Sequence, residues 1–202
     1  MAQKRHTEVP ELSAPTGADW KRAHDALMEA FASARVFYEW IDAPFGKVFL
    51  AKTDEGLCRV SFRRKEDELV DDLEKRELLP EKGSEQLDPE RRQFEEYFDG
   101  KRQKFDLPVD IRWGTPFERK VLEAANEIPF GSCACYTDVA ERIGHPKAAR
   151  AVGNALGKNP VAIVIPCHRV VASGGRLGGY TGGVDIKKTL MNIEGIQVEE
   201  AT

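Results

Sequence analysis

A cysteine, a histidine and an arginine follow one another as Cys167-His168-Arg169, directly after the apolar run VAIVI and Pro166. A cysteine thiolate is a strong nucleophile, and nearby positive charge favours the thiolate over the thiol. The β-branched run is typical of a strand buried on both faces, and proline removes a backbone donor where that strand ends. We therefore predict a strand over 161–165 that presents a reactive cysteine, although a single cysteine in such a place is more often inert.

The histidine next to this cysteine is a candidate general base. Adjacent residues on an extended chain point to opposite sides, so we do not expect a direct bond from His168 to Cys167, and a bridging water would satisfy the geometry. A histidine base also needs an orienting group, commonly a carboxylate. Few acids follow position 142, and Glu194, near the end of the predicted helix DIKKTLMNIEG, is the best placed by elimination.

The segment after the cysteine, SGGRLGGYTGG, holds six glycines between Ser173 and Gly183, with Tyr180 and Thr181 among them. Glycine loops are often only flexible turns. Because this loop comes directly after a candidate nucleophile, it could also hold a planar ligand against exposed backbone amides.

A helix-turn-helix precedes the cysteine in the predicted order of elements. Thr115-Pro116-Phe117-Glu118 has the pattern of a capping box and predicts a helix to about Glu127. The stretch TDVAERIG predicts a short helix that ends at Gly144, and His145-Pro146 opens another that runs to about Gly157. This last helix, PKAARAVGNALG, is almost bare, which fits either close helix packing or approach to a nucleic-acid groove with Arg150 projecting into it. Periodicity does not decide between the two.

The first half of the chain predicts a small α/β unit. The runs VFYEWI, KVFLA and LCRVSF, separated by the turn signals APFG and TDEG, predict three successive antiparallel strands. Two charged helices, RKEDELVDDLEKREL and PERRQFEEYFDG, follow them. We divide the chain into an N-terminal extension over 1–35, which is disordered to about residue 17 and then forms a short helix docked on the body, an α/β domain over 36–108, and a C-terminal domain over 109–202.

Composition limits the classes of protein that this chain can be. With 202 residues, 41% of them hydrophobic, it can bury a real core. No stretch approaches the roughly 18 apolar residues of a membrane span and no secretory signal opens the chain, so we expect a cytoplasmic protein. The four cysteines predict neither disulfides nor a metal site, and CAC over 133–135 is interpreted as strand.

Charge is distributed unevenly. The formal net charge is -4, yet 142–193 carries eight Lys and Arg residues against the single acid Asp185. We expect this segment to face an anion.

Together these motifs resemble the O6-alkylguanine-DNA alkyltransferases, also called methylated-DNA–protein-cysteine methyltransferases. The resemblance covers about residues 36–196 and is most specific in GTPFERKVLEAANEIPFG, YTDVAERIGHPKAARAVGNALGKNP, IPCHRVV, GGYTGG and IEG. It implies an α/β (α+β) fold in which a small antiparallel-sheet, ribonuclease H-like domain precedes a winged helix-turn-helix domain. It also implies a monomer that binds the minor groove of double-stranded DNA, flips out an O6-alkylguanine and moves the alkyl group irreversibly to its own cysteine, without metal or cofactor. O4-alkylthymine is a further candidate substrate.

The resemblance also implies roles for single residues. Cys167 corresponds to the alkyl acceptor, His168 polarises it through a water, and Glu194 holds His168. Tyr136 corresponds to the tyrosine that donates to the guanine ring, Arg150 to the arginine that replaces the extruded nucleotide, and Asn159 to the asparagine that ties the turn after the recognition helix to the cysteine loop. The remaining implied positions contact DNA or line the base pocket: Thr137, Lys147, Ala149, Ala151 and Gly153 for DNA, and Val170, Tyr180 and Thr181 for the pocket.

Several residues depart from the family pattern. Thr181 stands where many members carry serine, which leaves tolerance of bulky alkyl groups open. Leu122 stands where many bacterial members carry tryptophan, and residues 1–35 lie outside the pattern. Three other classes remain as alternatives: an alkyltransferase-like protein that binds damage without repair, a winged-helix transcription factor, and a cysteine hydrolase. The acceptor cysteine argues against the first, the glycine pocket against the second, and the adjacency of Cys167 and His168 against the third.

Overall fold

The structure is a computed structural model and describes residues 16–197. The predicted disorder of residues 1–17 concerns positions that lie almost entirely outside this range. Within it, no helix is long and apolar enough to cross a membrane, and no group of three or more His, Cys, Asp or Glu side chains could hold a metal ion.

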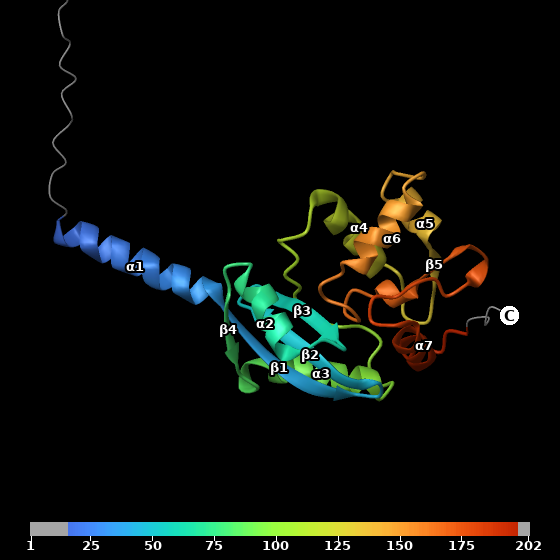
Figure 1. Cartoon of the computed structure of the whole chain (residues 1–202), viewed down its shortest axis with the longest axis horizontal. Helices are drawn as coiled ribbons and strands as arrows, with labels where there is room; N and C mark the ends of the chain where they lie inside the picture. Colours follow the sequence, from blue (N-terminus) through green and yellow to red (C-terminus); the bar gives the residue numbers. More distant parts are fainter. Residues whose placement is uncertain (1–15, 198–202) are drawn as a thin grey trace, which may run out of the picture. The chain divides into compact units, whose positions relative to one another are not determined.

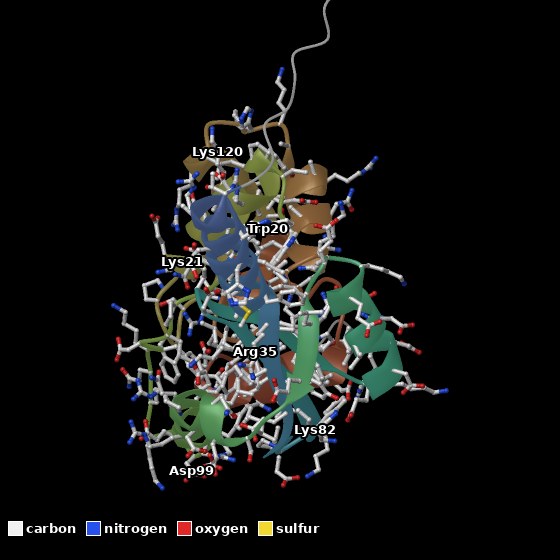
Figure 2. The ribbon with its side chains drawn as sticks, turned by 90° about the vertical axis from the view of Figure 1, so that its left-hand side faces the viewer. Trp20, Lys21, Arg35, Lys82, Asp99 and Lys120 are labelled. Carbon is white, nitrogen blue, oxygen red and sulfur yellow. The ribbon has the colours of Figure 1, made fainter. Side chains whose placement is uncertain are left out.

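Helix α1 (Gly17–Ala34) forms a unit of its own and confirms the predicted N-terminal helix. It begins with a reciprocal pair of bonds, in which Asp19 Oδ2 accepts from the Thr16 amide at 2.7 Å and Thr16 Oγ1 accepts from the Asp19 amide at 3.3 Å. Trp20 and Lys21 project from this helix (Figure 2), and its large apolar side chains are exposed. The predicted docking of this helix on the body stays a prediction.

From Arg35 onward the described chain forms one compact unit built on a four-stranded sheet of order β3-β2-β1-β4. The three predicted strands are confirmed as β1 (Arg35–Ala43), β2 (Gly46–Thr53) and β3 (Gly56–Phe62), paired antiparallel in sequence. The sequence analysis missed β4 (Leu79–Lys82), a short polar strand that pairs parallel to β1.

Both faces of this sheet are buried. Because successive residues of a strand point to opposite sides, their side chains enter two different apolar clusters. In β2, Phe49 and Ala51 join one apolar cluster, whereas Val48 and Leu50 join another. Helix α2 (Glu66–Glu74) packs Leu69 and Leu73 into the first cluster. In sequence, α2 lies between β3 and β4, and α3 (Asp88–Phe98) follows β4 (Figure 1).

Helix α3 belongs to the larger cluster, which continues without a break into the C-terminal part of the chain. Phe94 and Tyr97 of this helix are fully buried there. The same core includes the buried faces of the C-terminal helices, so one apolar core joins the sheet to the region that follows it. The predicted boundary near residue 108 therefore lies between two packed parts rather than at a flexible linker.

The C-terminal region contains the predicted helix-turn-helix and a minimal two-stranded sheet. Its elements are α4 (Pro116–Asn126), β5 (Ala134–Cys135), α5 (Tyr136–Arg142), α6 (Ala149–Gly157), β6 (Val170–Val171) and α7 (Val184–Ile193). Strands β5 and β6 pair parallel. Lys120 on α4 lies at one end of the body, and Lys82 on β4 and Asp99 after α3 lie at the other end (Figure 2).

The capping box at the start of α4 is confirmed. Thr115 Oγ1 accepts from the Glu118 amide at 3.2 Å, and Glu118 Oε2 accepts from the Thr115 amide at 2.9 Å. The strand interpretation of CAC is also confirmed, since β5 covers Ala134–Cys135. The recognition helix begins later than predicted, at Ala149 instead of Pro146. The chain first makes a turn in which the Ala148 amide donates to the His145 carbonyl at 2.8 Å.

The prediction of a strand over 161–165 is wrong. The run is buried as expected, and Val161 makes a parallel bridge to Val60 of β3. It then folds back in a tight turn that bridges Ala162 to Ile165, with Ile163 at a φ of 75°. A β-branched residue rarely adopts this left-handed conformation. Apolar composition indicates burial, but it does not distinguish an extended strand from a buried turn.

Candidate functional site

A cavity of about 900 Å³ opens between β3, α6 and the glycine loop, and Cys167 lies on its wall. Tyr136, Gly153, Asn159, Tyr180 and Thr181 line the same cavity, so six of the predicted site residues come together. β3 and the segments that follow β3 and α2 contribute a group of basic residues that the sequence analysis did not assign to the site: Arg59, Arg63, Arg64 and Arg76.

Cys167 begins a single 3-10 turn, Cys167–Arg169, and is 8% exposed. Its amide donates to the Ile165 carbonyl at 2.8 Å. Asn159 Nδ2 donates to the Cys167 sulfur at 3.1 Å and to the same carbonyl at 2.8 Å, while its Oδ1 accepts from the Val161 amide at 3.0 Å. One side chain thus fixes both the sulfur and the tight turn that leads to it.

Burial raises the pKa of the Cys167 thiol, and hydrogen bonding from Asn159 and the charge of Lys187 offset this only in part. The Tyr180 hydroxyl, which is buried without a well-formed partner, also favours the anion of this sulfur. The expectation that the adjacent basic residues make Cys167 a thiolate is therefore wrong for the resting protein. The side chain of Arg169 is directed elsewhere.

Glu194 lies at the C-terminal end of α7 and makes hydrogen bonds with both residues that follow the cysteine. Its Oε1 is 2.7 Å from His168 Nε2, and its Oε2 accepts from Arg169 Nε at 2.8 Å. Burial would raise the pKa of Glu194, but the bonds from His168 and Arg169 outweigh it and lower the pKa to about 2. The carboxylate is therefore ionised at any ordinary pH, and the contact predicted by elimination is present.

Burial lowers the pKa of His168, and the bond to Glu194 reverses this only in part. The imidazole is thus a neutral base that donates from Nε2 to the carboxylate. Its other nitrogen, Nδ1, is buried and has no hydrogen-bond partner among the described residues.

Tyr97 and Lys187 are buried residues beside this cluster that sequence reasoning missed. The Tyr97 hydroxyl, on α3, donates to Glu194 Oε1 at 2.8 Å. Lys187 is fully buried, and its Nζ donates to the carbonyls of Val170, at 2.6 Å, and Leu177. Burial lowers the pKa of Lys187 to about 8. In the sequence Tyr97 resembles any core aromatic on a helix, and Lys187 one of several basic residues, so no local pattern indicates either contact.

Tyr136 is the first residue of α5 and lies half-buried on the cavity wall. Two glycines leave room for it. A Cβ on Gly178, which has a φ of 66°, would lie 3.2 Å from the Tyr136 hydroxyl, and one on Gly153 would lie 3.6 Å from the ring. Burial, and then the charge of Cys167, raise the pKa of Tyr136, so its hydroxyl remains a hydrogen-bond donor.

The outer face of the helix-turn-helix is exposed. Helix α6 buries Val152, Ala155 and Leu156 against the core, so its bare side faces solvent rather than another helix. The side chain of Arg150 has no hydrogen bond or ion pair with any residue that the structure describes. The residues predicted to contact DNA are all at least partly accessible: Thr137, Lys147, Arg150 and Ala151 are exposed, and Ala149 and Gly153 are partly exposed.

Both the N-terminal sheet region and the C-terminal region match known protein families. Residues 36–111 match the family profile "6-O-methylguanine DNA methyltransferase, ribonuclease-like domain", and residues 116–196 match "6-O-methylguanine DNA methyltransferase, DNA binding domain". The chain belongs to the methylated-DNA–protein-cysteine methyltransferase family. It is 40% identical over 162 residues to the member from Methanosarcina acetivorans, covering 79% of this chain and 99% of that one. It is 38% identical over 165 residues to the constitutive member from Bacillus subtilis, covering 81% and 98%.

Solved structures of methyltransferases share the fold. The Mycobacterium tuberculosis OGT in complex with DNA matches with a TM-score of 0.67 and 35% identity, covering 79% of this chain and 92% of that one. The O6-methylguanine-DNA methyltransferase from Pyrococcus kodakaraensis matches with a TM-score of 0.58 and 26% identity, covering 80% and 99%. The predicted class, a mixed α/β fold with an N-terminal sheet and a helix-turn-helix domain, is confirmed.

Within this methyltransferase fold, the predicted pocket residues differ in their placement. Tyr180 stacks on Phe62 of β3 with ring centroids 6.2 Å apart, and Thr181 Oγ1 donates to the Gly157 carbonyl at 2.8 Å. Both therefore form cavity wall. Val170 is completely buried and does not line the cavity, and its carbonyl accepts a hydrogen bond from Lys187 Nζ.

Proposed function

We propose that this chain repairs DNA by moving the alkyl group of an O6-alkylguanine to the sulfur of Cys167, once per molecule. The observation that carries this proposal is the single arrangement of a cavity-lining cysteine, a neutral histidine and an ionised glutamate, beside an exposed helix-turn-helix. Residues 109–202 would supply the DNA-binding surface and the acceptor, and residues 36–108 would support them.

The chemistry begins with base flipping, because guanine O6 is not accessible to a nucleophile inside a stacked duplex. We infer that the exposed Arg150 occupies the space left by the extruded nucleotide, while the bare side of α6 lies in the minor groove. Lys147 and Thr137 would contact the backbone beside it. The cavity next to Cys167 would receive the base, with Tyr136 facing the guanine ring.

The transfer itself is an in-line displacement, in which a bond forms from Cys167 Sγ to the alkyl carbon and the bond from that carbon to O6 breaks. The resting thiol must first lose its proton. His168 Nδ1, which has no hydrogen-bond partner in the described part of the chain, would accept it through a bridging water, and Glu194 would stabilise the resulting imidazolium. A hydrogen bond from Tyr136 to the guanine ring would let the base leave without a full negative charge. The thioether is stable, so the protein reacts once.

One experiment tests this proposal. The protein is incubated with duplex DNA that carries a labelled O6-methylguanine, and the peptides are analysed by mass spectrometry. We expect one methyl group per protein chain, on the peptide that contains Cys167, and a 1:1 complex with DNA if the monomer is the active species. The variant Cys167→Ala should bind the same DNA without taking up label. Binding without transfer by the wild-type protein would instead indicate a damage-binding protein.

A further inference from the structure

Three donors converge on one oxygen of Glu194. Its Oε1 lies 2.7 Å from His168 Nε2, 2.8 Å from the Tyr97 hydroxyl and 3.0 Å from Arg169 Nη2. Two of these donors belong to the cysteine loop. The third comes from α3, which covers the N-terminal sheet and lies 97 positions away in sequence.

We propose that Tyr97 is a positioning residue for alkyl transfer. Its hydroxyl holds the Glu194 carboxylate in place for His168 and reduces how strongly that carboxylate stabilises the protonated form of His168. This inference rests on the proposed function and extends it, because it gives the N-terminal domain a part in the reaction. The domain thereby contributes a hydroxyl to the catalytic carboxylate as well as a scaffold.

The geometry favours this role over simple core packing. The ring of Tyr97 already packs against Phe98 and Phe105, with centroids 5.7 and 5.3 Å away. The hydroxyl adds nothing to those apolar contacts, and it must find a partner because it is fully buried. Its partner is the same oxygen that accepts from the candidate base, so the hydroxyl and the imidazole share the negative charge of one atom.

The sign of the effect follows from this sharing. A hydroxyl that donates to a carboxylate disperses its charge, and the carboxylate then stabilises a neighbouring imidazolium less. Without the hydroxyl, His168 should therefore hold its proton to higher pH. Since a protonated His168 cannot accept the thiol proton, the rise of the reaction rate with pH should then begin later.

Other charged and titratable groups near Tyr97, Glu194 and His168 are Arg169, Lys187, Cys133 and Tyr180, and Cys167 precedes His168 in sequence. Tyr97→Phe changes none of them and keeps the ring contacts. A matched control exists on the same domain, because the Tyr38 hydroxyl donates to Glu66 at 3.2 Å, and Tyr38 packs against the apolar cluster that does not contain Cys167.

The experiment measures single-turnover methyl transfer from duplex DNA between pH 5 and pH 9 for the wild-type protein, Tyr97→Phe and Tyr38→Phe. We expect the acid side of the profile to move up by about half to one pH unit in Tyr97→Phe and to stay in place in Tyr38→Phe. In a Glu194→Gln background, Tyr97→Phe should cause no further movement, because the shared charge is already gone.

A direct measurement separates this inference from the function on which it rests. The ring of His168 is titrated by NMR in the DNA-free protein, with its signals assigned by comparison with His168→Gln. A higher His168 pKa in Tyr97→Phe than in the wild type supports the role of Tyr97. Equal values in two folded proteins, with equal rate profiles, would leave Tyr97 a structural residue only. Absence of transfer in the wild type would instead overturn the proposed function.

Discussion

Asn159 binds Cys167 through the sulfur, with Nδ2 at 3.1 Å from Sγ, and at the same time spans the buried turn at 161–165. The amide is thus a hydrogen-bond donor to the atom that must become an anion. Burial raises the pKa of that thiol, and the bond from Asn159 lowers it and so partly offsets the effect of burial.

Replacing Asn159 by alanine should therefore make Cys167 harder to ionise. A hydrogen bond to a charged group contributes about 1.5–3 kcal/mol, so we expect the reaction of Cys167 with iodoacetamide at pH 8 to slow by roughly 10- to 100-fold. The rate is measured by mass spectrometry of the Cys167 peptide. Asn154→Ala, at an exposed position on α6, is the control, and equal rates in the two variants would contradict the role of the Asn159 amide.

Glu194 predicts a specific dependence of stability on acid. Its pKa is about 2 in the folded protein against an ordinary 4.5, so the carboxylate stabilises the fold above pH 4.5 and this contribution disappears as pH falls toward 2. The shift corresponds to about 3 kcal/mol. Urea unfolding between pH 5 and pH 2 should therefore show a steeper loss for the wild type than for Glu194→Gln.

The exposed Glu123→Gln on α4 serves as the control for this titration and should keep the wild-type loss. A Glu194→Gln protein with the same acid sensitivity as the wild type would mean that the carboxylate is not held as the structure indicates.

Local signals predict much of this protein correctly because their causes lie within a few residues. The Thr115 capping box, the end of α5 near Gly144 and the three antiparallel strands depend on neighbours in sequence, and all are confirmed. The run at 161–165 shows the limit of such signals. Its composition indicates burial correctly, but the turn at Ile163 depends on Asn159 and β3, which periodicity does not include.

The residues of the candidate site also differ in whether the sequence alone could indicate them. Cys167, His168 and Glu194 can be singled out because of their residue types and the scarcity of acids. The partner of Arg169 could not be predicted, because adjacency suggested that its charge faces the sulfur, whereas it faces Glu194. Tyr97 and Lys187 reach the site only through packing between distant elements, and their sequence context is that of ordinary core and surface residues.

Arg150 is expected to matter for duplex DNA more than for a free base. If it replaces the extruded nucleotide, Arg150→Ala removes on the order of 1–2 kcal/mol from the flipped state, or about 10-fold in rate. Transfer is measured from O6-methylguanine in a duplex and from free O6-benzylguanine. The exposed Arg119→Ala on α4 controls for loss of positive charge. Equal losses on both substrates would argue against the proposed insertion.

Lys187 should hold the glycine loop in place as well as favour the thiolate. Its Nζ binds the carbonyls of Val170, which precedes that loop, and Leu177, which lies within it. Lys187→Met keeps the volume of the side chain but leaves both buried carbonyls unpaired, which costs about 2–4 kcal/mol. We expect lower stability in urea and faster proteolysis within 173–182.

The same variant should also change the chemistry at Cys167, because the positive charge of Lys187 lowers the pKa of that thiol. The iodoacetamide profile of Cys167 should shift to higher pH in Lys187→Met. Lys188→Met, at the partly exposed next position, is the matched control and should change neither the loop nor the profile. If Lys187→Met lowers stability but leaves the Cys167 profile unchanged, Lys187 anchors the loop without acting on the sulfur.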